Sequence, residues 1–106
     1  MKLGIVVYSN DPETVWNALR IAVLAQDKGD QVSIFFIGKG VEGETISTEK
    51  YPIAVQLKDF KNWGGKLFAC QNCLKARNME GTQLMPVSTL GDLYEIILES
   101  DKIVTF

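Results

Sequence analysis

Two short apolar segments on either side of a helical stretch constrain the fold of this chain more than any other feature. Residues 3–8 form an apolar run rich in β-branched side chains, which predicts a buried strand. Apolar positions then recur at helical spacing as far as Lys28, and Gly29 is a residue that commonly ends a helix. Residues 32–37 predict a second buried strand. A strand, a helix and a strand with short connections indicate a parallel βαβ unit.

The middle of the chain continues this alternation. Residues 38–52 predict a loop with a short helical turn, and residues 53–63 a second helix that ends at the Gly64-Gly65 pair. Residues 66–69 predict a third strand, which brings Cys70 to its carboxyl end. Residues 71–77 predict a short helix that begins directly after this strand.

The C-terminal third predicts one more helix between two short strands. We expect strands at residues 82–85 and 103–106. Ser88 is expected to cap the helix, and its inner face is expected to consist of Leu90, Leu93, Tyr94, Ile97 and Leu98. The sequence therefore predicts an α/β protein: one domain over residues 1–106, with a parallel sheet of about five strands and helices on both faces, layered as in flavodoxin.

Composition and charge narrow the classes of partner. With a net charge of −2 and 23% charged residues, the chain lacks the basic excess typical of nucleic-acid or anionic-membrane binding, so we expect neither partner. Its longest apolar runs, 21–25 and 34–37, are too short to span a bilayer. The N-terminus leads directly into the first strand without a cleavage site of the secretory type, so we expect a cytoplasmic location.

The inventory of reactive side chains is small. The chain has no histidine, which excludes Ser–His and Cys–His nucleophile pairs as well as metal sites that contain histidine. Its only two cysteines, Cys70 and Cys73, are three residues apart, a spacing typical of redox, sulfur or metal chemistry in a reducing compartment. Two thiols do not complete a tetrahedral zinc site, and a metal would need ligands from a second subunit. We therefore expect no metal and no cofactor.

The two cysteines are the candidate catalytic residues. They lie where a strand passes into a helix, and a thiolate at that point faces unpaired backbone N–H groups. Lys66, Lys75 and Arg77 are close in sequence, and we take Lys75 and Arg77 as supporting residues that add positive potential. The alternative is that the cysteines are inert and pack in the core.

Three loops are expected to share the edge of the sheet at the carboxyl ends of the strands. They are the loop with Asn10 and Asp11, the loop 38–43 with Gly38 and Gly40, and the Cys70–Cys73 turn. Residues 38–43 match the dinucleotide pattern G-x-G-x-x-G, but the residues that follow are poor helix formers and the chain has no second nucleotide-binding half. We interpret these glycines as a mobile loop beside the cysteines, and Asp11 is explained by a helix cap alone.

The cysteine segment resembles a known family signature. Cys70-Gln-Asn-Cys73-Leu-Lys-Ala-Arg77-Asn78 is similar to the C-x-x-C-x-x-x-R-G signature of DsrE/DsrF-like proteins, including the YchN-type subgroup. The resemblance extends to the Ser-Asn-Asp-Pro helix start, to residues 36–41, to residues 64–67 and to the terminal segment 99–106. Asn78 replaces the usual glycine, and asparagine is the next most tolerant residue of left-handed backbone.

The resemblance implies a function in sulfur transfer. Relatives carry sulfur as a cysteine persulfide in relay or sulfur-oxidation pathways, and those with one cysteine keep the residue seven positions before the arginine, here Cys70. It implies a sulfurtransferase-type carrier with sulfur donor and acceptor proteins as partners, and a homo-oligomer, either a trimer or a hexamer. Two alternatives stay open: a thiol–disulfide switch formed by Cys70 and Cys73, and a non-catalytic assembly subunit.

Overall fold

All five strands of the protein run parallel in one sheet. The structure is a computed structural model that describes residues 1–106. The strands lie in the order β4-β3-β2-β1-β5, so β4 and β5 form the two edges. In chain order the elements are β1 (Lys2–Val7), α1 (Pro12–Asp27), β2 (Gln31–Phe36), the 3₁₀ helix η1 (Gly38–Thr45), α2 (Ile53–Asn62), β3 (Lys66–Cys70), α3 (Gln71–Ala76), β4 (Val87–Ser88), α4 (Leu90–Glu99) and β5 (Lys102–Thr105).

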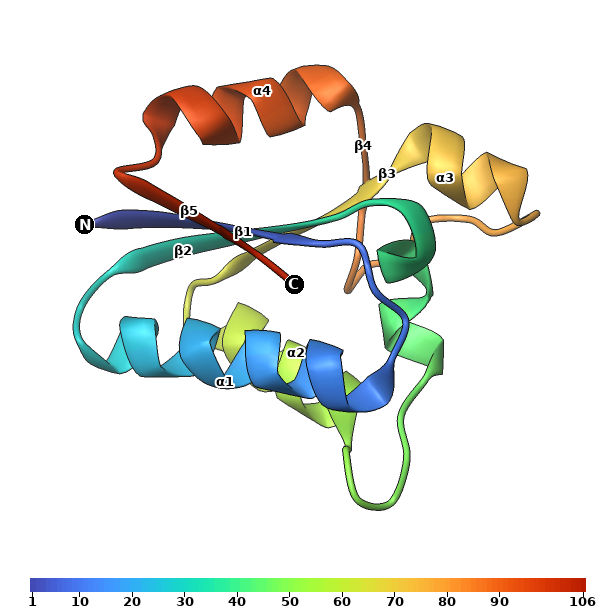
Figure 1. Cartoon of the computed structure of the whole chain (residues 1–106), viewed down its shortest axis with the longest axis horizontal. Coiled ribbons are helices and arrows are strands. Elements are labelled where there is room, and N and C mark those ends of the chain that lie inside the picture. Colours follow the sequence, from blue (N-terminus) through green and yellow to red (C-terminus); the bar gives the residue numbers. More distant parts are fainter.

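Helices cover both faces of this sheet, as the alternating pattern predicts. Helices α1 and α2 pack on one face, and α4 lies alone over the other (Figure 1). The alternate residues Leu3, Ile5 and Val7 of β1 are buried. On the neighbouring strands, Ile34 of β2 pairs with Ile5, and Leu67 of β3 pairs with Ile34; both are also buried. Because side chains alternate between faces along a strand, these residues form one apolar surface. The predicted fold class is confirmed.

Local signals explain where the helices begin and end. The Asp11 carboxylate accepts a hydrogen bond from the Thr14 N–H at 3.0 Å and caps α1, with Pro12 as its first residue. Gly29 follows the helix with a φ of +90°, where a residue with a Cβ atom would be strained. Asn78 follows α3 with a φ of +53°, so it takes the left-handed conformation that a glycine usually supplies.

Two sequence predictions near the C-terminus are wrong. Residues 82–85 form a turn instead of a strand: the backbone N–H of Thr82 donates to Met85 O at 3.0 Å, and the Thr82 hydroxyl accepts from the Met85 N–H. Pairing with β3 begins only at Pro86, whose carbonyl accepts from the Ala69 N–H at 2.9 Å. Ser88 belongs to the short strand β4 and does not cap α4.

The cap of α4 is one residue later than predicted. The Thr89 hydroxyl accepts a hydrogen bond from the Asp92 N–H at 3.3 Å, and the Asp92 carboxylate accepts from the Thr89 N–H at 3.0 Å. This reciprocal pair is a capping box, so the helix starts at Leu90.

The predicted inner face of α4 is largely exposed. Of the five side chains assigned to it, only Leu93 packs partly against the core, together with Ile96. No residue of α4 is buried. A helix that is apolar on its outer side is unusual in an isolated domain, because such surface is normally covered. The four exposed side chains form what we call the α4 surface: Leu90, Tyr94, Ile97 and Leu98.

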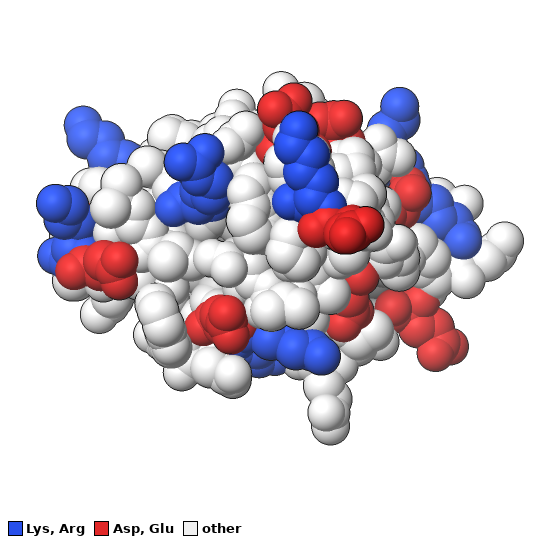
Figure 2. Space-filling view, turned by 90° about the horizontal axis from the view of Figure 1, so that it is seen from below, with Lys and Arg blue, Asp and Glu red and all other residues white.

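The outer surface has no large area of one charge on the side of α1 and α2. Figure 2 shows this face, where basic and acidic side chains are interspersed among wide uncharged areas. No helix in the structure combines the length and the apolar character needed to cross a membrane.

Candidate functional site

Both cysteines lie at the carboxyl edge of the sheet, where β3 passes directly into α3. Cys70 is the last residue of β3 and the residue before α3, while Cys73 lies within the first turn of that helix. Both are free thiols. Cys70 is buried, with 4% of its surface exposed, and Cys73 is half-buried. From its position inside the first helical turn, Cys73 is expected nearer the buried face of the helix than Cys70, and the structure shows the opposite order of burial.

The Cys70 side chain makes no capping hydrogen bond to α3, although it occupies the capping position. Helix α3 contains only six residues. The expected stabilisation of a Cys70 thiolate by capping N–H groups is therefore not part of this site, and its chemistry depends on the other groups around the pair.

Cys73 connects α3 to η1, the segment that follows β2. Its sulfur accepts a hydrogen bond from the backbone N–H of Gly38 at 3.1 Å. Gly38 is the first residue of η1, which follows β2, so this contact joins the loops that follow two adjacent strands. The prediction that the 38–43 segment and the cysteine turn share one edge is confirmed.

The environment of Cys73 favours the protonated thiol. Burial raises the pKa of Cys73, and a hydrogen bond with the Cys70 side chain raises it further. The Gly38 N–H and the positive charge of Arg77 act in the opposite direction, but the net pKa of the Cys73 thiol is above its ordinary value.

Arg77 is the second link between α3 and η1. Its Nε donates to the Glu42 carboxylate at 3.2 Å, and its guanidinium also donates to the carbonyl oxygen of Cys73 at 3.1 Å. Both side chains of this ion pair are about one-third exposed, at 29% and 32%. Glu42 thus partly balances the positive charge of Arg77. The sequence predicts Arg77 as a supporting residue but does not predict this partner.

The glycines of η1 allow close packing and not the mobile loop that we expect from the sequence. Gly40 and Gly43 are buried, as is Val41 between them. A Cβ atom on Gly40 would lie 2.0 Å from the carbonyl oxygen of Val7, far inside van der Waals contact. Only glycine permits η1 to lie against the end of β1, and this contact fixes its start beside the cysteines.

Three other predicted site residues make no hydrogen bond to either thiol. Lys75 is exposed and lines a separate pocket with Gln71 and Asn78. The Asp11 carboxylate is engaged by Thr14, whose backbone N–H lowers the pKa of Asp11. Asn10 precedes this cap in the loop after β1 and has no side-chain hydrogen bond to either thiol.

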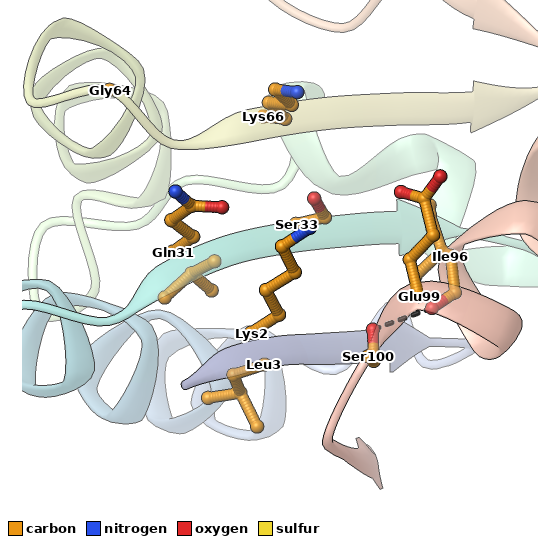
Figure 3. Close-up of a pocket in the computed structure, with 10 residues that line it drawn as sticks. Lys2, Leu3, Gln31, Ser33, Gly64, Lys66, Ile96, Glu99 and Ser100 are labelled. Carbon is orange, nitrogen blue, oxygen red and sulfur yellow. Dashed lines mark hydrogen bonds between the residues drawn. The ribbon is translucent and has the colours of Figure 1, made fainter.

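None of the four main pockets contains a cysteine. Figure 3 shows one of about 310 Å³, between the amino ends of the strands and the end of α4. Its polar lining includes Lys2, Lys66 and Glu99, and it lies at the opposite edge of the sheet from Cys70. No three potential metal ligands gather anywhere in the structure. The four main pockets therefore place no small-molecule cavity at the thiols, of which Cys70 is buried and Cys73 is half-buried.

Glu42 is the residue of the site that sequence reasoning missed. It lies inside the G-x-G-x-x-G match, where its neighbours suggest a phosphate loop. The available signal is its spacing: it follows Gly38 by four residues, as Arg77 follows Cys73, but the pairing depends on how η1 packs against α3.

Comparisons with known proteins agree with this architecture. The model of the DsrE/DsrF-like family matches residues 1–106. The uncharacterized protein MJ0989 of Methanocaldococcus jannaschii is 32% identical over 102 residues, which cover 89% of this chain and 88% of that protein. The uncharacterized protein MK0008 of Methanopyrus kandleri is 32% identical over 115 residues, with 95% and 91% covered. The crystal structure of the ychN protein from E. coli superimposes with a TM-score of 0.83 at 21% identity, over the full length of both chains.

Proposed function

Since this chain belongs to the DsrE/DsrF-like family, we propose that it is a sulfur carrier that holds sulfur as a persulfide on Cys70. The observation that carries this proposal is the paired arrangement of two free thiols at the carboxyl edge of the sheet, with a backbone N–H directed at one of them. The family membership supports a sulfur-relay type of role. The spacing of the only two cysteines is typical of a reducing compartment, and we place the reaction in the cytoplasm.

The transfer conserves atoms and electrons. The Cys70 thiolate attacks the outer sulfur of a donor persulfide, R–S–SH, and an S–S bond forms as the S–S bond of the donor breaks. The donor leaves as a thiolate, R–S⁻, which takes up a proton. The thiolate of an acceptor then attacks the outer sulfur on Cys70 in the same way, and Cys70 is released as a thiolate. The sequence needs no metal, cofactor or external oxidant.

Cys70 is proposed as the carrier because it is the cysteine that relatives with one cysteine keep, seven positions before the arginine. Burial and the Cys70 side chain raise the pKa of Cys73, so the Cys73 thiol is the weaker attacking group at neutral pH. A protonated Cys73 is also a poor nucleophile toward the inner sulfur of a persulfide on Cys70. That attack would form a Cys70–Cys73 disulfide and release H₂S, so the same environment protects the carried sulfur.

We propose proteins, not small molecules, as sulfur donor and acceptor. Neither cysteine lines a main pocket, so a small substrate would have little surface to bind beside the thiols. Cys70 is only 4% exposed, so its sulfur becomes reachable when the contact between η1 and α3 opens. A docked protein has enough interface to drive such an opening.

A homo-oligomer, as a trimer or hexamer, is part of the proposal. The α4 surface carries four large apolar side chains that are each at least 47% exposed, on the only helix that covers its face of the sheet. The charged side chains of α4 are all acidic, so its outer side is apolar with an acidic border. A second copy of this chain is the occupant we propose, because an apolar surface of this kind resembles the half of a permanent interface.

A thiol–disulfide switch is the second candidate, and the interaction between the Cys70 and Cys73 side chains favours it. One experiment separates the two. The reduced protein is incubated with a protein persulfide or with inorganic polysulfide, and its intact mass is measured. Addition of sulfur that dithiothreitol removes supports carriage. Loss of two hydrogen atoms without added sulfur supports the switch and contradicts carriage.

A further inference from the structure

Two polar contacts join η1 to α3 at matching positions. The first runs from the Gly38 N–H to the Cys73 sulfur, and the second from Arg77 to the Glu42 carboxylate. The residues of the second contact each follow those of the first by four positions, and both contacts link residues 35 apart in the chain. The two segments therefore lie side by side, with the cysteine contact at one end and the ion pair at the other.

Arg77 connects Glu42 of η1 to the backbone of the cysteine turn. Its guanidinium holds Glu42 and, through another nitrogen, the carbonyl oxygen of Cys73. The two side chains are about two-thirds covered, so their attraction is less screened than that of an ion pair in open water. Loss of either charge would leave the other partly buried without a partner.

Backbone hydrogen bonds hold the start of η1 against β1. The Ile37 N–H donates to Val7 O at 2.9 Å, and the Gly40 N–H donates to Ile37 O at 3.0 Å. Gly38 lies between them with a φ of +57°. These bonds fix Gly38 beside the end of β1, and its distance from the Cys73 sulfur depends in addition on how closely α3 is held against η1.

We propose that Glu42 is a positioning residue of the thiol site: through Arg77 it keeps the Gly38 N–H on the Cys73 sulfur. It touches neither thiol and acts only through the placement of η1 against α3. This inference takes the cysteine pair of the proposed function as the working site. The test measures the titration of Cys73 and not the loading of sulfur. The role of Glu42 can therefore be tested even if the protein does not carry sulfur.

The expected consequence is a change in the acidity of Cys73. A backbone N–H that donates to sulfur stabilises the thiolate, and the groups that act on Cys73 are Cys70, Arg77 and this N–H. Removal of Glu42 alone would also unbalance the charge of Arg77, which by itself lowers the pKa of the thiol. A double variant keeps the net charge unchanged, but it also removes the Arg77 charge that lowers the pKa of Cys73, so the position of the Gly38 N–H is measured separately by amide exchange.

The experiment uses Glu42→Ala with Arg77→Met, in which methionine keeps the apolar stem of the arginine. The pH dependence of Cys73 alkylation is measured on a Cys70→Ser background, where Cys73 is the only thiol. Loss of a hydrogen bond to the Cys73 thiolate raises the pKa of Cys73, which slows alkylation about tenfold below that pKa. Glu44→Ala is the matched control, since Glu44 lies on η1 but accepts from the Thr82 hydroxyl.

A second readout keeps the test independent of the Cys70 substitution. In the protein with both cysteines, hydrogen exchange of the Gly38 amide is followed by NMR. We expect at least tenfold faster exchange in the double variant and unchanged exchange in Glu44→Ala. A double variant whose Gly38 amide stays protected, or whose Cys73 titrates like that of the control, would overturn the proposal.

Discussion

The backbone N–H of Gly38 donates a hydrogen bond to the sulfur of Cys73 at 3.1 Å, across 35 residues of sequence. This contact connects η1, which follows β2, to α3, which follows β3, at the carboxyl ends of these two adjacent strands. It also holds the Cys73 thiol beside η1. Burial and the Cys70 side chain raise the pKa of Cys73, while the Gly38 N–H acts in the opposite direction.

The raised pKa of Cys73 predicts a loss of stability at alkaline pH. A group whose pKa is raised by folding stabilises the native state below its unfolded pKa, and this stabilisation disappears as the pH rises through the folded pKa. The free energy of unfolding should therefore fall above the ordinary pKa of a thiol, and the fall should be smaller in Cys73→Ser. Urea unfolding over a pH series measures it. Equal slopes in both proteins would contradict the prediction.

Gly40→Ala should destabilise the protein by about 2 kcal/mol or more. The added Cβ would lie 2.0 Å from the Val7 carbonyl oxygen, a backbone atom that cannot move without displacing β1. Gly91→Ala is the control, because its Cβ would meet only the Thr89 hydroxyl at 3.3 Å, at the exposed start of α4. The control should change stability by less than about 1 kcal/mol. Chemical denaturation compares them, and equal losses would refute the packing argument for η1.

Leu98→Glu on the α4 surface should shift the protein from an oligomer to a monomer. Leu98 is 60% exposed in the isolated chain, so a charge there leaves the fold intact but is costly in an apolar interface. Val55→Glu is the matched control, since Val55 is 59% exposed on α2, on the other face of the sheet. Light scattering at micromolar concentration reports the assembly. A monomeric wild-type protein, or an equal effect of both substitutions, would contradict the proposed interface.

The sequence predicts the fold better than it predicts the details of the site, and the reasons are physical. The βαβ pattern depends on local periodicity and on residues such as Gly29, so element type and order follow from it. The same local logic predicts that Asn78 supports a left-handed turn. It fails at residues 82–85, where a short segment that resembles a strand instead forms a turn that the Thr82 hydroxyl closes.

At the site, the limits of sequence reasoning have a different cause. The proximity of Gly38 to Cys73 follows from the rule that parallel strands end at one edge. The order of burial of the two thiols and the pairing of Arg77 with Glu42 depend on how η1 rotates against α3, which no local pattern specifies. Periodicity assigns the apolar residues of α4 to the core, because it does not distinguish an apolar face that packs on the sheet from one that is exposed.

The most direct measurement of the central claim is the intact mass of three proteins after incubation with a persulfide donor. Wild type, Cys70→Ser and Cys73→Ser are reduced, loaded and measured before and after dithiothreitol, with circular dichroism to confirm that each is folded. We predict that wild type and Cys73→Ser gain sulfur that dithiothreitol removes, and that Cys70→Ser gains none. Sulfur on Cys70→Ser, or a wild type that only loses two hydrogen atoms, would contradict Cys70 as the carrier.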